Sequence, residues 1–400
     1  MKRTLAVGEV IEVVIEKVAH GGHFIARFEG AVIFVRHAIP GEKCRVEITS
    51  VGSSFNRGDV IEVLEASADR TVAPCEFSHR AGCGGCDFQH IKIERQLELK
   101  SDVITEQFAR IAKMDVKVEV EKVGAELGWR SRITSTTDRN GQLGFIGSRS
   151  HTVIPVANCL VGASNLDFAQ LASRTWKGDM RVEIAASNTG ERSISLVATR
   201  GESKSRLSEG PAILHEEVLG KTLQVSSDSF WQGHINAPTI LSEVVKDFSS
   251  VRTGDHVLDL YGGVGLFSAV LIDALGENGQ IDLIEGSKSA TSDASRNFAD
   301  YPNIKIITGD VAKHLPRIKS ADVVVLDPPR DGAGKVVVNE IARLRARKVV
   351  YVACDPAALA RDTGYFLEHG YSLVKLRAFD LFPMTHHIEC VALFEPAKVS

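Results

Sequence analysis

The sequence predicts a multidomain α/β protein with a small β-barrel first, a mixed α+β region in the middle and a doubly wound α/β sheet last. Five short strand patterns separated by Gly and Pro turns fill the first part of the chain. Strand and helix patterns alternate from about residue 253 onward. A tight set of cysteines marks the middle. We therefore expect domains at residues 1–66, 67–235 and 236–400.

The composition is that of an ordinary globular protein. The 400 residues are 44% hydrophobic and 24% charged, with a net charge of −4. No apolar run approaches the ~20 residues that span a bilayer, and the start lacks a signal-peptide pattern. We expect a cytoplasmic protein without membrane contact and take a monomer as the default state. Because the net charge is near zero, a surface for nucleic acid must be local.

The first domain contains five expected strands, at residues 9–17, 23–28, 31–35, 44–49 and 59–64. Five short strands in so few residues suit a closed barrel of the OB type, a fold that often binds RNA. The pattern alone leaves a generic β-barrel and an RNA-binding barrel both open.

The middle region carries three closely spaced cysteines. Cys75, Cys83 and Cys86 form the pattern Cys-x7-Cys-x2-Cys with glycines between them, which lets the backbone fold around a metal without Cβ clashes. A closed four-ligand site needs one more donor, and Cys159 is the nearest remaining cysteine. Four thiolates suit either zinc or an iron–sulfur cluster, and both remain open here.

The last domain is expected to hold seven strands with helices between them, at residues 256–261, 280–284, 304–308, 322–326, 348–353, 371–376 and 387–394. After the first of these, Asp259 precedes the turn Gly262-Gly263-Val264-Gly265, and Glu285 ends the next strand. This arrangement fits a nicotinamide dinucleotide or S-adenosylmethionine (SAM). Ser268 replaces the last glycine of the dinucleotide pattern, and the position of Asp259 favours SAM.

Two further motifs place polar groups at strand ends. Asp327-Pro328-Pro329-Arg330 follows an apolar strand, and its prolines make a stiff loop that can hold a heterocycle. Glu389 stands at the head of the last strand, where loss of water would raise its pKa and suit proton transfer. Taken alone, Glu389 would more often be a salt-bridge partner.

The stretch from Lys348 to Leu359 predicts a buried strand that ends at Cys354 and leads directly into a helix. Asp355 is a suitable N-cap, Pro356 suits the first helical position, and Gly370 ends the helix. A thiol ahead of a helix N-terminus meets the positive end of the dipole, which lowers its pKa. The stretch alone favours a buried structural cysteine over a nucleophile.

Together these motifs resemble the RNA 5-methyluridine methyltransferases, which use SAM to methylate uracil C5 in tRNA and ribosomal RNA. The resemblance covers nearly the whole chain, and the motifs that carry it are Phe230 to Gln232, Asp259 to Gly265, Glu285, Asp310, Asp327 to Arg330, Cys354 to Pro356 and His386 to Glu389.

This resemblance implies a TRAM domain at the barrel and a Rossmann-like class I methyltransferase domain at the end of the chain. It implies Cys354 as the nucleophile and Glu389 as the base. The implied SAM contacts are Gln232, Tyr261, Glu285, Asp310 and Asp327. The implied ligands of a [4Fe–4S] cluster, with zinc as the alternative, are Cys75, Cys83, Cys86 and Cys159. The barrel favours ribosomal RNA, 23S rRNA above all, as the substrate over tRNA.

The chain departs from the family pattern at Ala353, Asp355 and Leu266, where the family usually has Ser, Asn and Asn. An acid beside the nucleophile raises the pKa of the thiol. These departures motivate an alternative of another class, a catalytically inactive RNA-binding or chaperone-like factor. A nicotinamide dehydrogenase is a distant third, because it would explain neither the cysteine set nor Cys354 and Glu389.

Overall fold

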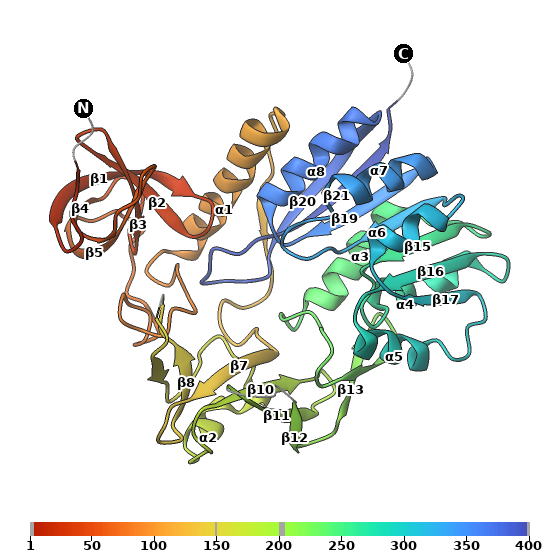
Figure 1. Ribbon diagram of the computed structural model, residues 1–400, viewed down its shortest axis with the longest axis horizontal. Helices are drawn as coiled ribbons and strands as arrows, with labels where there is room; N and C mark the ends of the chain where they lie inside the picture. The colour runs from red at the N-terminus through yellow and green to blue at the C-terminus, as the bar shows by residue number, and fades with distance from the viewer. Residues whose placement is uncertain (1–3, 149, 200–204, 398–400) are drawn as a thin grey trace.

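The computed structural model describes residues 4–148, 150–199 and 205–397, and its three parts are visible in Figure 1. The first is a closed five-stranded barrel in the order β1-β2-β3-β5-β4. Its strands are β1 Val10–Ala19, β2 His23–Phe28, β3 Ala31–Arg36, β4 Lys43–Ser50 and β5 Asn56–Glu65. Ile11, Val13 and Ile15 alternate with exposed residues and point into the barrel, as a strand with one buried face requires. The predicted barrel is confirmed.

Helix α1 (Ile93–Gln107), which continues as a short π-helix at Phe108–Ala112, lies between the barrel and the large sheet (Figure 1). Apolar residues of the barrel, of α1 and of one face of the sheet form one continuous core. The rings of Phe24 in the barrel and Phe88 ahead of α1 are 5.8 Å apart. The barrel is thus packed against the rest of the molecule through a shared core.

The central region is a six-stranded antiparallel sheet in the order β12-β11-β10-β7-β8-β9, followed by the hairpin β13-β14. Its elements are β7 Arg132–Thr137, β8 Leu143–Ile146, β9 Val153–Pro155, a 3-10 turn Ser164–Leu166, α2 Phe168–Ala172, β10 Met180–Ala186, β11 Arg192–Ala198, β12 Arg206–Glu209, β13 Ile213–Val218 and β14 Lys221–Ser226. Ile133, Val182 and Ile184 are among the residues of its own small core.

The last part is a mainly parallel sheet in the order β17-β16-β15-β18-β19-β21-β20-β6. Its strands are β6 Val120–Lys122, β15 His256–Leu260, β16 Gln280–Glu285, β17 Ile304–Thr308, β18 Val323–Leu326, β19 Lys348–Ala353, β20 Tyr371–Asp380 and β21 Glu389–Pro396. Its helices are α3 Ala237–Ser249, α4 Leu266–Leu275, α5 Lys288–Asn297, α6 Val311–His314 with a 3-10 turn Leu315–Arg317, α7 Gly334–Leu344 and α8 Pro356–Glu368.

This sheet has eight strands where the sequence predicts seven. The additional strand, β6, comes from the middle of the chain and pairs in parallel with β20 at the sheet edge. Three residues carry too little pattern to be recognised as a strand. β6 therefore lies in the part of the chain expected to form the central domain, although it pairs into the sheet of the last domain.

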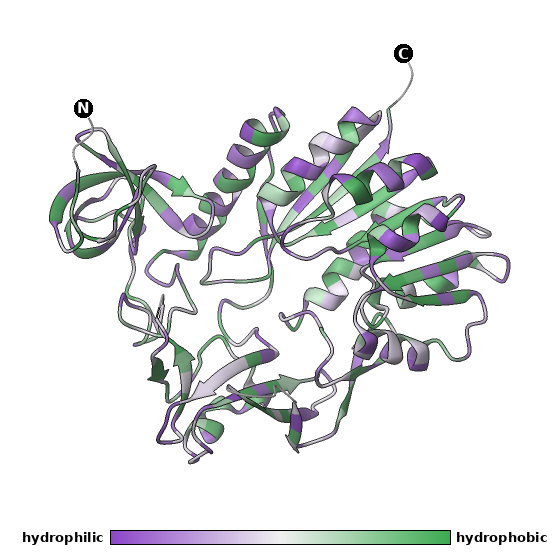
Figure 2. Ribbon diagram, viewed as in Figure 1, coloured by the Kyte–Doolittle hydropathy of each residue, from purple (hydrophilic) through white to green (hydrophobic). Residues whose placement is uncertain are grey.

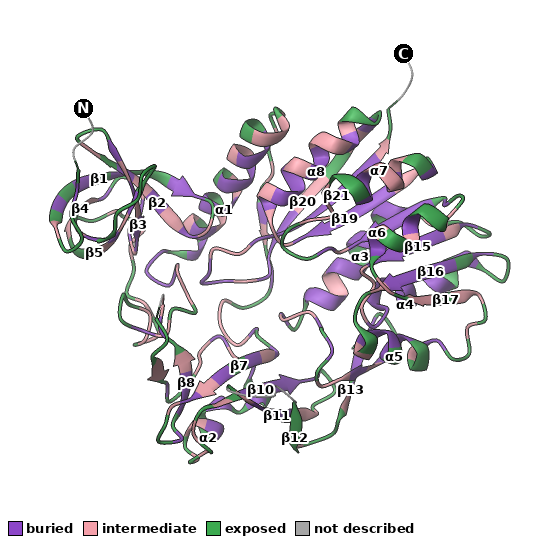
Figure 3. Cartoon of the chain, in the orientation of Figure 1, coloured by how far each residue is buried: buried purple, intermediate pink, exposed green. Residues whose placement is uncertain are grey.

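Both faces of the sheet are covered by helices, and its central strands are apolar and buried (Figures 2 and 3). In β19, Val349 and Tyr351 pack into the core shared with α7 and α8, whereas Val350 and Val352 pack into the core shared with α3 and α4. A parallel sheet buried in this way leaves its carboxyl edge as the place for ligands. Within the described ranges, no helix is both long and apolar enough to cross a bilayer.

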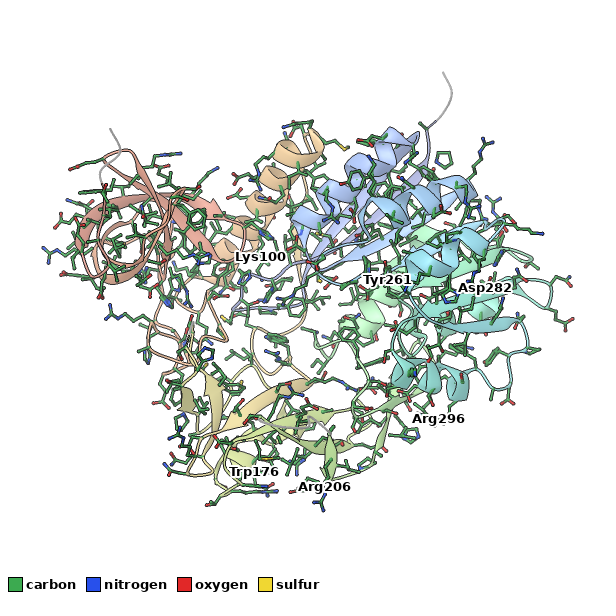
Figure 4. All side chains as sticks on the ribbon, in the orientation of Figure 1. Lys100, Trp176, Arg206, Tyr261, Asp282 and Arg296 are labelled. Atoms are coloured by element: carbon green, nitrogen blue, oxygen red, sulfur yellow. The ribbon has the colours of Figure 1, made fainter. Side chains whose placement is uncertain are left out.

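A buried ion pair ties α1 to the end of β20. Lys100 Nζ lies 2.6 Å from Asp380 Oδ1, and neither side chain is more than 1% exposed. Lys100 also donates to the carbonyl of Phe382 at 3.2 Å. Figure 4 shows Lys100 between the barrel and the sheet. This contact fixes the start of the loop that leads to Glu389.

Candidate active site

The candidate site lies at the carboxyl edge of the parallel sheet. Asp259 lies near the end of β15, Glu285 ends β16, Asp327 directly follows β18 and Cys354 directly follows β19. Adjacent parallel strands deliver their last residues to the same edge, so these four segments meet there although they are far apart in the sequence.

Cys354 and Glu389 lie at the same end of the paired strands β19 and β21. The two strands are antiparallel, and the last pair of their ladder is Ala353 with Cys390. Cys354 follows Ala353 and Glu389 precedes Cys390, and the charge of Glu389 acts on the thiol. Glu389 is only 4% exposed. The structure therefore brings a thiol and a buried carboxyl group together.

The carboxyl groups at this corner make one another harder to ionise. Burial raises the pKa of Glu389 well above its ordinary value, and the charge of Asp327 adds to the increase. Burial and the charge of Asp259 together raise the pKa of Asp327 to about 7, although Gln232 donates to it. The raised pKa that the sequence predicts for Glu389 is confirmed.

The pKa of the Cys354 thiol differs from the expectation. Burial raises it to about 12, the charges of Glu389 and Asp327 add to the increase, and Arg330 offsets it only in part. The prediction of a pKa lowered by the helix dipole is wrong, because the loss of water and the nearby carboxyl groups outweigh the positive end of α8.

The turn after β15 leaves space for a ligand close to the backbone. Tyr261, Gly263 and Gly265 have positive φ values of 59°, 56° and 96°. A Cβ at Gly263 would meet nothing within 4 Å. Asp259 Oδ2 accepts from the N–H and O–H of Ser268 at 3.1 and 2.6 Å, whereas Asp259 Oδ1 is buried without a partner among the described residues. A free buried acceptor beside an open turn fits a ligand that carries a donor.

The other predicted ligand-binding residues lie around the same turn. Gln232 Nε2 donates to Asp327 Oδ2 at 3.2 Å, and Glu285 Oε2 accepts from a backbone N–H of the glycine turn at 3.1 Å. Burial and the charges of Asp310 and Asp362 raise the pKa of Tyr261 to about 12. Figure 4 shows Tyr261 at the edge of the sheet.

A cavity of about 180 Å³ opens on the barrel side of Cys354. Its wall is formed mainly by the turn between β1 and β2 (residues 18–22), by residues 354–356 and by residues 386–388. Arg330 and Lys100 also line it. The space beside the thiol is therefore bounded by the barrel as well as by the sheet.

The four predicted metal ligands line a second cavity, of about 90 Å³. Burial raises the pKa of the Cys86 thiol to about 12, and the thiols of Cys159, Cys83 and Cys75 add to the increase. Within residues 4–148, 150–199 and 205–397, no three His, Cys, Asp or Glu side chains are close enough to share one metal ion. The four cysteines therefore share the lining of one cavity.

Sequence reasoning missed the contacts that hold the loop ahead of Glu389. The backbone N–H of Phe88 donates to the carbonyl of Met384 at 3.0 Å, and Gln96 Oε1 accepts from the N–H of Met384 at 3.0 Å. His386 Nδ1 lies 2.6 Å from Asp87 Oδ2, a pair 299 positions apart in the chain. No local pattern signals such contacts. Arg330 stands in a recognised motif, but its place in the wall of the cavity beside Cys354 emerges only in the fold.

Two family models match the chain. Residues 5–61 match the TRAM domain, and residues 313–397 match the family described as tRNA (uracil-5-)-methyltransferase. The second match contains Asp327, Cys354 and Glu389.

Full-length relatives and a solved structure also match. A protein of Streptomyces avermitilis is 42% identical over 98% of this chain and 99% of its own, and one of Corynebacterium efficiens is 36% identical over 98% and 96%. Both are described as uncharacterized RNA methyltransferases. The crystal structure of Pyrococcus abyssi tRNA (uracil-54, C5)-methyltransferase with S-adenosyl-L-homocysteine covers 96% of this chain and 99% of its own, with a TM-score of 0.76 and 20% identity. At that identity the likeness shows the fold.

The raised pKa of Cys354 predicts slow alkylation. We expect iodoacetamide to modify Cys354 at pH 8 at least about tenfold more slowly than an exposed thiol of pKa about 8.5, with a rate that rises beyond pH 9. Mass spectrometry of the Cys354 peptide over time measures this rate. Arg330→Leu removes the positive neighbour and should slow the reaction further. A fast reaction at pH 7 that no longer increases above pH 8 would contradict the raised pKa.

Proposed function

Because the chain belongs to the family of RNA methyltransferases that join a TRAM domain to a uracil-5-methyltransferase domain, we propose that it forms 5-methyluridine in RNA with Cys354 as the covalent nucleophile and Glu389 as the base. The observation that carries this proposal is the register of β19 and β21, whose last pair, Ala353 with Cys390, leaves the thiol and a buried carboxyl group at the same end of the two strands. Attack on the ring and removal of its proton need two such groups in one site.

Uracil C5 is a weak nucleophile, and addition of a thiolate changes this. The sulfur of Cys354 forms a bond to C6, and the electron pair of the C5–C6 double bond moves into an enolate. C5 then takes the methyl group as the sulfur–methyl bond breaks. Glu389 removes the proton from C5, the double bond forms again, and the Cys354 thiolate leaves. The target uridine must leave its stack or lie in an unpaired loop to reach this corner.

SAM supplies a methyl group on a positively charged sulfur when it is bound. We assign its binding to Gln232, Tyr261, Glu285, Asp310 and Asp327. The open backbone at Gly263 and the unpartnered oxygen of Asp259 support this assignment. The raised pKa values of Asp327 and Glu389 support it further, because a positive charge in this corner favours the ionised form of both groups.

The proposed substrate is ribosomal RNA, 23S rRNA above all, with tRNA as the alternative. The TRAM match supports RNA as the partner, and the barrel is the feature that favours ribosomal RNA. We take the working form to be a cytoplasmic monomer. Mapping 5-methyluridine in the rRNA and tRNA of cells that lack the protein separates the two substrates.

We assign a [4Fe–4S] cluster to Cys75, Cys83, Cys86 and Cys159. A cluster and a single zinc ion are both held by four thiolates. The shared cavity of the four cysteines supports a common site for them, and the family resemblance favours the cluster. Phe88 and Asp87, which follow this cysteine segment, hold the loop ahead of Glu389, so the cluster would serve to keep that loop in place.

Cys354→Ala should abolish methyl transfer while leaving the binding of SAM and RNA intact. The variant removes only the sulfur, which none of the SAM-binding residues needs. Transfer of label from labelled SAM to total RNA measures activity, and calorimetry with S-adenosylhomocysteine measures binding. If the natural chain transfers label in the same assay, the alternative of a catalytically inactive RNA-binding factor is wrong. Full activity of Cys354→Ala would show that the covalent scheme is wrong.

Protein purified without oxygen should be brown and contain about four iron atoms per chain. Cys86→Ser should lose most of this iron and its visible absorption. Cys44→Ser is the matched control, because Cys44 is buried in the barrel and does not line the cysteine cavity. A colourless protein with one zinc ion per chain would show that the site holds zinc and that the cluster assignment is wrong.

A further inference from the structure

The barrel contacts the residue beside Cys354. His20, in the turn between β1 and β2, has its Nε2 2.9 Å from Asp355 Oδ2, with the two side chains 38% and 25% exposed. Asp355 Oδ1 accepts the N–H groups of Ala357 and Ala358 at 2.9 Å each. One carboxylate therefore caps α8 with one oxygen and binds the barrel with the other, and the predicted N-cap is confirmed.

The identity of residue 355 matters for this double contact. Asparagine and aspartate are comparable N-caps. An asparagine that used its oxygen for the cap would present an NH₂ group to His20, and that group can bond only to an Nε2 that carries no proton. A carboxylate accepts at both oxygens, so Asp355 can cap α8 and at the same time accept a proton donor on His20.

The same turn also lies directly against the loop that leads to Glu389. A Cβ at Gly22 would lie 2.7 Å from His386 Nδ1, which is too close. Gly22 also has φ +76°, a conformation that other residues rarely adopt. The same Nδ1 atom of His386 lies 2.6 Å from Asp87 Oδ2. Residues 20–22 therefore touch both segments that bear the proposed catalytic groups, and they form part of the wall of the 180 Å³ cavity.

The contact also stabilises the charge next to the thiol. The pKa of Asp355 is lowered, because the hydrogen bonds from His20 and from the start of α8 outweigh the effect of its burial. The groups that act on Cys354 at this corner are Glu389, Asp327 and Asp355, which raise its pKa, and Arg330, which lowers it. Without His20, Asp355 Oδ2 would lose this partner while Oδ1 still capped α8.

We propose that His20 is a positioning residue for methyl transfer: by holding Asp355, it fixes the turn that bears Cys354 against the loop that leads to Glu389. The barrel then completes the active site in addition to binding RNA. This inference rests on the proposed role of Cys354.

Steady-state methyl transfer from labelled SAM to total RNA from cells that lack the protein tests the inference. His20→Ala should lower kcat about tenfold, the loss expected for a hydrogen bond to a charged group, with an apparent KM for RNA within about twofold of the natural chain. His20→Gln keeps an N–H donor of similar reach and should restore most of kcat. Lys17→Met is the matched control. It removes another contact between the barrel and the body, the 2.6 Å pair of Lys17 with Glu106 on α1, and should change neither constant.

The double variant His20→Ala with Asp355→Ser shows whether His20 acts through Asp355, because serine is a comparable N-cap but has no second oxygen for His20. We expect the histidine change to add no further loss in the Asp355→Ser background. Additive losses would overturn the inference, as would a rise in KM alone or an equal loss of kcat in Lys17→Met. Failure of the proposed function looks different, since Cys354→Ala would then stay active whatever the His20 variants do.

Discussion

The gathering of carboxyl groups beside one thiol is the constraint on which the rest of the site depends. Asp259, Asp327 and Glu389 lie in a corner poor in water, and each raises the pKa of a neighbour. The surrounding donors are arranged to offset this, as Gln232 does for Asp327. In the free protein the balance keeps Cys354 in its neutral form, which is a poor nucleophile. On the proposed function, a positively charged methyl donor shifts that balance, so the thiol becomes reactive where the reaction needs it.

The architecture serves to hold that corner from several sides. The barrel, α1 and one face of the sheet share a single core, and the β1–β2 turn lies directly against the loop ahead of Glu389. The same loop begins at the buried pair of Lys100 with Asp380 and is bonded to the segment that follows the cysteines. Three regions that look like separate units along the chain therefore converge on one loop. On the proposed function, the cysteine cavity lies outside the reaction centre and would contribute to the placement of this loop.

The features that the sequence predicts well are those with local causes. The barrel follows from period-two strands and their turns, and the cap of α8 follows from Asp355 and Pro356. Features that depend on residues far apart in the sequence could not be predicted from it. β6 is three residues long and becomes a strand only because β20 offers an edge. The pKa of Cys354 depends on burial and on Glu389 and Asp327, which arrive from other strands. The contact of His20 with Asp355 joins residues 335 positions apart, and no periodicity records it.

The central claim is that Cys354 bonds to the uracil while Glu389 releases it, and the Glu389→Gln variant tests both halves at once. The variant is incubated with labelled SAM and RNA, resolved on a denaturing gel, digested and analysed by mass spectrometry. The account predicts an RNA–protein adduct in which Cys354 is joined to a uridine that already bears the new methyl group. Free 5-methyluridine RNA at the normal rate without an adduct, or an adduct at a residue other than Cys354, would contradict it.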